Sequence, residues 1–285
     1  MEAFKILCLG GGGVKGIMHI GALEELEKEV GPLHKHFTKG VYGCSVGSVF
    51  ATAVAFGLSV EEMKKNYPKL GDFKKIINMD KLTEISTILN KKGIFPMNKF
   101  EEVLIQIFNE FNIDIKSKKC CDALIPLYIS ASNLSKGTPS LFTGNVPVLK
   151  AIMASCCLPF IFQPQIINNN IYIDGGFITN ILLNLVPSED RSMALGFSII
   201  HTKEKIKADK LTKLSPLDYI YKLYKISCLY ENAKNPYKNN INLSFDRGSG
   251  ISDFTEDEKN EMILIGSKLC RRFITQCTNQ KLIKV

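Results

Sequence analysis

A serine flanked by two glycines is the residue of this chain best suited to nucleophilic chemistry. Ser45 stands at the centre of the pattern G-x-S-x-G, between an apolar stretch and a run of small residues typical of a helix. In this pattern Gly43 and Gly47 let the backbone turn sharply, and the serine hydroxyl comes to the edge of a sheet. The helix that begins at Val46 adds positive charge where an oxyanion would form.

A base for this serine is offered by an aspartate that ends a short apolar run. Asp174 is followed by Gly175 and Gly176, which places it on a sharp turn at a strand end, where the sites of open α/β sheets lie. A carboxylate is a weak base at its ordinary pKa of about 3.9, so burial must raise that pKa. His201 is the one histidine that follows Asp174, but it begins a lysine-rich segment. We therefore expect a Ser45–Asp174 dyad.

A run of glycines near the N-terminus offers a second group of donors. It follows an apolar run and precedes a helical pattern. Successive N–H groups without Cβ atoms can point at one anion. Gly11, Gly12 and Gly13, together with Val46, are therefore expected to form an oxyanion hole.

The same glycines also fit a dinucleotide-binding fingerprint. Gly11, Gly13 and Gly16 match G-x-G-x-x-G between a strand and a helix. A dinucleotide site also needs an acidic residue at the end of the second strand to hold the ribose. That strand ends instead at residues 43–45, which include no acidic residue. A dinucleotide site would therefore lack its ribose-binding group, and the same position carries Ser45, the candidate nucleophile of a hydrolase.

Alternating strands and helices must position these residues. Apolar runs predict strands at residues 4–9, 41–42, 125–131, 171–174 and 194–200, with a hairpin arm at 141–142. Helical spacing predicts helices at residues 14–30, 46–56 and 148–155, and a further helix from Ser215. Capping boxes predict helix starts at Ser59, Asn98 and Thr255. His19 lies on the non-apolar side of the first helix and is expected to be a surface or structural residue. The alternation predicts an α/β fold with a mostly parallel sheet covered on both faces.

Length and composition favour one globular domain. The 285 residues are 45% hydrophobic and 22% charged, which is ordinary for a soluble protein, and no internal repeat is present. We expect a single domain at 1–285, with a motif-bearing core at about 4–200 and a helical part at about 215–280. Nine cysteines without a C-x-x-C pair predict reduced, mostly buried thiols rather than disulfides or a metal site.

Targeting and charge patterns bear on location and partners. The short N-terminal apolar run predicts no secretory signal, and no apolar stretch reaches the length of a membrane span, so we expect an intracellular, cytoplasmic protein. The net charge of +8 is mild. Segment 203–225 interleaves lysines with tyrosines, which favours peripheral contact with an anionic membrane surface. No nucleic-acid partner is expected, because no base-reading motif accompanies this segment.

Four sequence blocks together resemble the patatin-like phospholipase family. They lie in the family's order within residues 7–180. The blocks are G-G-G-x-[RK]-G at Gly11 to Gly16 with Lys15 in the basic position, G-x-S-x-G at Ser45, an Ala/Ser-rich helix at Ala151 to Ser155 running into P-x-x-F-x-P at Pro159, Phe162 and Pro164, and D-G-[GA] at Asp174. A helix like that at Thr255 to Phe273 is also usual in the family.

The resemblance implies a three-layer α/β/α fold and hydrolysis of acyl esters of phospholipids or related lipids, without calcium or another cofactor. Asp174 would accept the Ser45 proton, Ser45 would attack the ester carbonyl, and water would release the fatty acid from the acyl-enzyme. Lys15 would orient the loop or contact a lipid phosphate. Cys44, beside the nucleophile, is expected to be a packing residue.

Two departures from the family pattern affect loops rather than the dyad. Gly10 stands where relatives often carry Asp or Ser, and Asn180 is followed by Ile181 and Leu182 where relatives tend to have proline. Both departures can alter loop shape and so substrate preference. The sequence leaves two alternatives open: an acyltransferase that uses the same dyad, and a catalytically idle lipid-binding or interaction protein.

Overall fold

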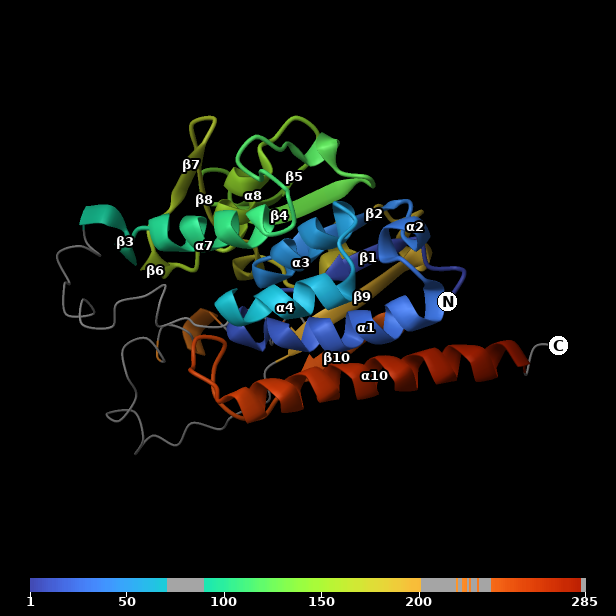
Figure 1. Cartoon of the computed structure of the whole chain (residues 1–285). Coiled ribbons are helices and arrows are strands. Elements are labelled where there is room, and N and C mark those ends of the chain that lie inside the picture. Colours follow the sequence, from blue (N-terminus) through green and yellow to red (C-terminus); the bar gives the residue numbers. More distant parts are fainter. Residues whose placement is uncertain are drawn as a thin grey trace.

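The computed structural model describes residues 1–70, 90–200, 219, 222–224, 226, 230 and 237–282 (Figure 1). Side chains at 67–70 and 280–282 are not described. His201, the start of the helix predicted from Ser215 and most of segment 203–225 lie outside the described residues.

A sheet with a parallel centre organises the chain. The strands of its parallel part are β1 (Ile6–Leu9), β2 (Gly40–Cys44), β4 (Leu127–Asn133), β9 (Ala194–Ile200) and β10 (Asn240–Ser244). They lie in the order β10-β9-β1-β2-β4, and every neighbouring pair is parallel. The predicted mostly parallel centre is thus confirmed. Strand β10 was not foreseen, because the sequence around it was assigned to a helical part.

Antiparallel strands extend the sheet beyond β4. The strands β5 (Thr138–Phe142) and β8 (Asn170–Asp174) both pair with β4, and β7 (Gln165–Ile167) pairs with β8. A two-residue turn joins β7 to β8, with φ of 49° at Asn168 and 59° at Asn169. Two successive positive φ values are typical of a tight hairpin turn, and asparagine tolerates them well. A separate pair consists of β3 (Gly93–Phe95) and β6 (Phe160–Phe162).

Side chains of the central strands alternate between two buried faces. On β1, Leu7 and Leu9 join the larger core, whereas Ile6 and Cys8 join a smaller one. Helices that contribute to the larger core are α1 (Met18–Val30), α3 (Val46–Ala55), α8 (Val148–Ser155) and α10 (Glu256–Leu282). The smaller core includes residues of η5 (Leu182–Leu185), a short 3-10 helix. The arrangement is the expected three-layer α/β/α fold.

Further helices complete the described part of the chain. The helices are α2 (Leu33–His36), α4 (Val60–Leu70) and α7 (Asn98–Asn109). The further 3-10 helices are η1 (Gly13–Ile17), η3 (Cys120–Asp122), η4 (Gly175–Phe177) and η6 (Arg191–Met193). The described cysteines are free thiols, and Cys44 is fully buried in the smaller core.

The predicted capping boxes have mixed outcomes. Ser59 and Glu62 cap α4 reciprocally, since the Ser59 N–H donates to Glu62 Oε2 at 2.7 Å and the Glu62 N–H donates to Ser59 Oγ at 3.3 Å. The box headed by Thr255 is likewise present before α10. The box headed by Asn98 was wrong, because Asn98 lies inside α7 and the residue at the helix start is Met97, without a side-chain cap.

Helices α1 and α10 lie side by side below the sheet (Figure 1). Two glycines allow this approach: a Cβ on Gly21 would lie 1.8 Å from the Ile263 carbonyl oxygen, and one on Gly266 would lie 2.0 Å from the Met18 carbonyl oxygen. No side chain larger than hydrogen fits at either position. The contact therefore anchors the C-terminal helix to the helix that follows the glycine loop.

A bidentate ion pair reinforces this contact. Arg271 donates to both carboxylate oxygens of Glu25 at 2.9 Å, and Ser267 Oγ donates to Oε1 at 3.0 Å. The hydrogen bonds from Arg271 lower the pKa of Glu25 to about 2, against the opposing effect of burial. The carboxylate of Glu25 thus stays charged over the ordinary pH range.

The substitution Gly266→Ala tests the helix contact. Because the new methyl group would overlap the Met18 carbonyl, we expect the free energy of unfolding to fall by about 1–3 kcal/mol. Urea denaturation of the full chain measures this change. Thr275→Ala, on the exposed side of the same helix, should change stability by less than about 0.5 kcal/mol and serves as the control. Equal stability of the two variants would contradict the proposed packing.

Candidate active site

Ser45 occupies the turn between β2 and α3. Its φ of 50° and ψ of −133° are strained for a residue other than glycine. A Cβ on Gly47 would lie 2.0 Å from the Leu9 carbonyl oxygen, and one on Gly43 would lie 2.5 Å from the Cα of Ser48. The two motif glycines are therefore required for the turn to pack against the neighbouring backbone.

Serines outside the predicted motif support this strained turn. The Ser45 N–H donates to Ser155 Oγ at 2.8 Å, and Ser155 Oγ donates to the Ser130 carbonyl oxygen at 2.6 Å. Ser48 Oγ donates to the Ser45 carbonyl oxygen at 2.6 Å. Sequence reasoning assigned Ser155 to an Ala/Ser-rich block, and only the packing of α8 against the turn shows its contact with the backbone of Ser45.

The register of the sheet brings Asp174 to the level of Ser45. Cys44, the last residue of β2, pairs with Ser130 on β4. The next residue of β4, Ala131, pairs with Asp174 at the end of β8. Strand β8 runs antiparallel to β4, so it starts beyond the end of β4 and runs back until Asp174 lies next to Ala131, level with the end of β2. Residues far apart in the sequence thus meet at one point of the sheet.

Asp174 is buried and hydrogen-bonded. Its side chain lies beside that of Ser45, and its Oδ1 accepts from the Gly176 N–H and from the Tyr224 hydroxyl, each at 2.9 Å. Burial raises the pKa of Asp174 to about 6, while the nearby Ser45 side chain and the hydrogen bonds from Gly176 and Tyr224 oppose that rise. A carboxylate with this pKa can accept a proton near neutral pH far better than an exposed one.

The glycines after Asp174 leave space for its neighbours. A Cβ on Gly175 would lie 2.5 Å from the Ser130 carbonyl oxygen, and one on Gly176 would lie 2.1 Å from the Tyr224 hydroxyl. Sequence reasoning placed Tyr224 in the basic and aromatic segment and not at the site. The contact depends on how distant parts of the chain pack, so no local signal could have revealed it.

One predicted oxyanion donor is already engaged. The Gly11 N–H donates to Asn180 Oδ1 at 2.7 Å, and Asn180 Nδ2 donates back to the Gly11 carbonyl oxygen at 3.2 Å. The inclusion of Gly11 in the oxyanion hole is therefore corrected, because its N–H is used to hold the loop. Gly12 and Gly13 follow it, with φ of 57° at Gly13, and lie at the start of η1.

Val46 is the first residue of α3, and its N–H is one of the groups that a helix leaves without an intrahelical partner. It directly follows Ser45. Gly16 lies against it, since a Cβ on Gly16 would come within 2.5 Å of a Val46 methyl carbon. The start of α3 and the glycine loop are therefore in direct contact beside the serine.

Lys15 points into the protein. Its ammonium donates to the Phe245 carbonyl oxygen at 2.7 Å, and the residue is only 2% exposed. The Val14 N–H donates to the Gly250 carbonyl oxygen at 2.7 Å, so the loop after β10 holds the glycine loop at two points. This placement agrees with the loop-orienting alternative and contradicts the alternative of a contact with a lipid phosphate, because the ammonium is buried.

His19 is fully buried beneath the glycine loop rather than at the surface. Its Nε2 lies 2.8 Å from the Gly10 carbonyl oxygen. Burial lowers the pKa of His19 to about 4, so the ring is neutral at physiological pH and Nε2–H can donate to that carbonyl. The sequence predicted that His19 is either a surface residue or a structural residue. The structure agrees with the structural role, whereas the burial of the ring was not predicted.

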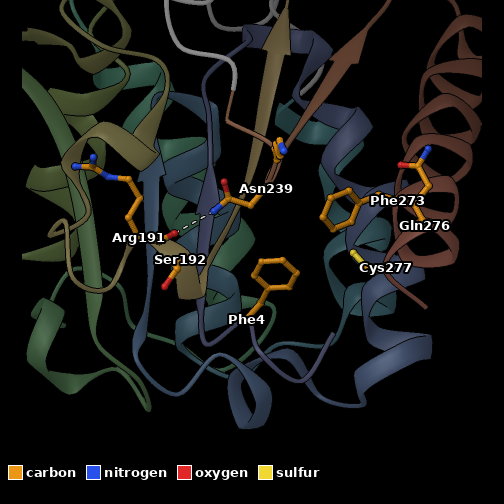
Figure 2. Close-up of a pocket in the computed structure, with 8 residues that line it drawn as sticks. Phe4, Arg191, Ser192, Asn239, Phe273, Gln276 and Cys277 are labelled. Carbon is orange, nitrogen blue, oxygen red and sulfur yellow. Dashed lines mark hydrogen bonds between the residues drawn. The ribbon is translucent and has the colours of Figure 1, made fainter. Parts of the chain in front are cut away.

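A groove of about 500 Å³ lies at the opposite edge of the sheet from Ser45 (Figure 2). Phe4, Arg191 and Asn239 lie just before or near the starts of β1, β9 and β10, and Phe273 faces them from α10. Parallel strands that begin here end at the edge where the serine turn lies. The groove is therefore separate from the Ser45–Asp174 site.

Within the part of the chain that the structure describes, no cluster of histidine, cysteine, aspartate or glutamate side chains could hold a metal ion. In the same part, no helix combines the length and the apolar character needed to cross a membrane.

Several known proteins are similar to this chain in sequence or in fold. Residues 7–186 match the family model described as patatin-like phospholipase. An uncharacterized protein of Acanthamoeba polyphaga mimivirus is 27% identical over 273 residues, which cover 92% of this chain and 82% of that protein. A probable lipid hydrolase of Invertebrate iridescent virus 6 is 27% identical over 84% of this chain and 77% of its own length. The crystal structure of VipD from Legionella pneumophila has a TM-score of 0.61 at 15% identity, covering 96% of this chain and 67% of that chain.

Asp174→Asn should make the protein more stable near neutral pH. Because the folded state raises the pKa of Asp174 above its unfolded value, the folded state binds more protons between the two values, and stability falls as pH rises. Removing the charge should raise the free energy of unfolding by up to about 3 kcal/mol at about pH 7.5, and by little near about pH 4.

Thermal unfolding at the two pH values measures the difference. Asp246→Asn, which changes an exposed carboxylate, is the matched control and should show no such dependence. An Asp174→Asn variant less stable than the wild type at both pH values would disprove the expected cost of burying this charge.

Proposed function

Because the chain belongs to the patatin-like phospholipase family, we propose that it cleaves fatty acyl esters of phospholipids or related lipids through a Ser45–Asp174 dyad. Lipid hydrolysis in general is supported by the family and by relatives such as the probable lipid hydrolase of the iridescent virus. One observation carries the dyad: the register of the sheet places the Ser45 side chain beside a buried carboxylate whose pKa is raised to about 6.

The proposed reaction has two acyl-transfer steps. Asp174 accepts the hydroxyl proton of Ser45 as the serine oxygen attacks the ester carbonyl, and the alcohol leaves with that proton. The acyl group then remains on Ser45 as an ester. Water attacks this ester with Asp174 again as the base, which releases the fatty acid and restores the serine hydroxyl.

The N–H groups of Gly12, Gly13 and Val46 would hold the oxyanion in both steps. Their supports are the Asn180 clamp on Gly11 and the buried Lys15 contact with Phe245, which keep the loop in place before the substrate arrives. Donors fixed in advance stabilise a developing charge without reorganisation, and losing one typically costs about 10²–10³ in rate.

We also propose that segment 203–225 contacts the membrane peripherally. Most of this segment lies outside the described residues. Two of its described side chains support the proposal, because Tyr219 is 47% exposed and Leu223 is 50% exposed. Amphipathic aromatic and basic side chains are favoured at the boundary between head groups and acyl chains.

Ser45→Ala should abolish ester hydrolysis without unfolding the protein. The test compares the wild type with Ser45→Ala and Asp174→Asn on a panel of phospholipids, lysolipids and neutral lipids. A fluorophosphonate probe should label the wild type and leave the Ser45→Ala variant unlabelled, because the probe needs an activated serine. Ser188→Ala, which changes an exposed serine in the segment before β9, is the control and should still be labelled.

Hydrolysis by Ser45→Ala at the wild-type rate would remove the proposed mechanism. A wild type that resists the probe would instead favour the idle-protein alternative. Product analysis with an added alcohol separates a hydrolase from an acyltransferase, since only the latter would transfer most of its acyl groups to the alcohol.

Activity should depend on the ionisation of Asp174. Because the base must be charged, the acid limb of the kcat/KM profile is expected near the Asp174 pKa of about 6. Tyr224→Phe removes a hydrogen bond that favours the charged form, so this limb should move to higher pH by about one unit. Tyr219→Phe is the matched control, and an unmoved limb in Tyr224→Phe would show that the tyrosine does not tune the base.

A further inference from the structure

Three exposed apolar side chains form a row across the edge of the sheet next to Asp174. Ile166 and Ile171 are direct partners in the β7–β8 pair. Leu134 follows the pair of Asn133 with Tyr172, and its N–H donates to the Ile171 carbonyl oxygen at 2.8 Å. Residues directly opposite each other in a sheet project from the same face. Leu134, Ile171 and Ile166 therefore make one continuous strip, here called the apolar row.

The side chains of the apolar row are large and apolar, yet much of their surface is exposed to solvent. The exposed fractions are 56% for Leu134, 39% for Ile171 and 73% for Ile166. Phe177 and Ile178, which follow the Asp174 turn, are 43% and 37% exposed. Large exposed apolar side chains scattered singly are normal, whereas several in one place mark a surface that another phase or molecule covers.

The position of the row relates it to the dyad. Strand β8 runs from the row toward Asp174, so Ile171 lies three residues, or roughly 10 Å, from the proposed base. Leu134 lies past the end of β4, at the edge where Ser45 is found. Figure 1 shows the β7–β8 hairpin projecting away from the body of the sheet. A flat surface that met this hairpin would also face the edge that carries the dyad.

The charged residues near the apolar row indicate which kind of surface the row contacts. Although the protein has 28 acidic residues, none occurs from Ala123 to Ile173, where the charged residues are Lys136 and Lys150. Lys136 lies in the turn just after Leu134. A segment with exposed apolar side chains, no negative charge and a nearby lysine suits a bilayer with anionic lipids, which repels carboxylates and attracts ammonium groups.

We propose that the apolar row inserts into the phospholipid bilayer and brings the Ser45–Asp174 edge to its lipid substrate. The choice of a lipid partner rests on the proposed function, whereas the exposure and register of the row do not. This contact is additional to the one proposed for segment 203–225, because the row belongs to β7, β8 and the end of β4.

Vesicle flotation of the full chain tests the proposal. The Ile166→Gln/Ile171→Gln double variant should bind vesicles of phosphatidylcholine with a minor share of phosphatidylglycerol about tenfold more weakly than the wild type. Leu124→Gln is the matched control, since Leu124 is 66% exposed but precedes β4 at the other edge of the sheet. Unchanged thermal unfolding shows that the variants are folded. Equal binding by the double variant and the wild type, or an equal loss in Leu124→Gln, would overturn the proposal.

Two further measurements separate this proposal from the proposed function. The Ser45→Ala variant should bind vesicles like the wild type, because insertion requires no chemistry. The double variant should lose hydrolysis of vesicle lipids while keeping hydrolysis of a short-chain ester in solution, and equal loss on both would assign the row to the site or fold and overturn membrane insertion. Failure of the wild type to cleave any ester would instead refute the proposed function and leave the binding result intact.

A second copy of the chain is the competing occupant of the row. Analytical ultracentrifugation of the wild type and the double variant distinguishes it. A wild-type dimer that the double variant loses, without vesicle binding by either protein, would overturn insertion in favour of self-association.

Discussion

The structure depends on one constraint: a carboxylate, Asp174, is buried away from water beside the Ser45 side chain. Asp174 is 1% exposed, and burial alone would drive its pKa well above the ordinary range. The nearby Ser45 side chain and the donors of Gly176 and Tyr224 offset that effect, so the pKa is about 6. A base with this pKa is mostly charged at neutral pH yet less weak than an exposed carboxylate. The energetic cost of keeping such a group buried falls on the rest of the fold, where extensive apolar packing supplies the stability.

Close backbone contacts around the dyad explain why glycine is needed where it occurs. At Gly47 and Gly175 a single extra carbon would overlap a carbonyl oxygen of a neighbouring element. At Gly13 both the φ of 57° and the proximity of the Gly250 carbonyl oxygen exclude a side chain. These contacts tie the serine turn, the aspartate turn and the glycine loop to β1, β4 and the loop after β10. The geometry of the site is therefore set by backbone packing, which changes less with thermal motion than side-chain packing does.

The two edges of the sheet differ in character. At the carboxyl edge Ser45 and Asp174 lie near exposed apolar side chains of residues 123–173, a stretch without acidic residues. At the opposite edge the groove near Phe4 and Arg191 combines aromatic and cationic groups (Figure 2). Ser45 lies at the other end of the parallel strands. This polarity follows from the parallel pairing of the central strands, because all of them end at one edge and begin at the other. The hairpin of β7 and β8 accentuates the difference by extending the carboxyl edge.

Local sequence was enough to predict most of the central strands and helices and the two residues of the proposed dyad. The serine turn and the aspartate turn have short-range signatures, since glycines at fixed spacing are required by the backbone itself, and helix α8 and strand β9 begin and end at the predicted residues. The sequence could not show that Asn180 engages the N–H of Gly11, that Lys15 turns inward to Phe245, or that Tyr224 contacts Asp174. Each of these contacts joins segments distant in the chain, and their partners are selected by how the layers pack. Residue type and spacing thus determined which groups could react, whereas tertiary packing decided which donors are free and how strongly the carboxylate holds its proton.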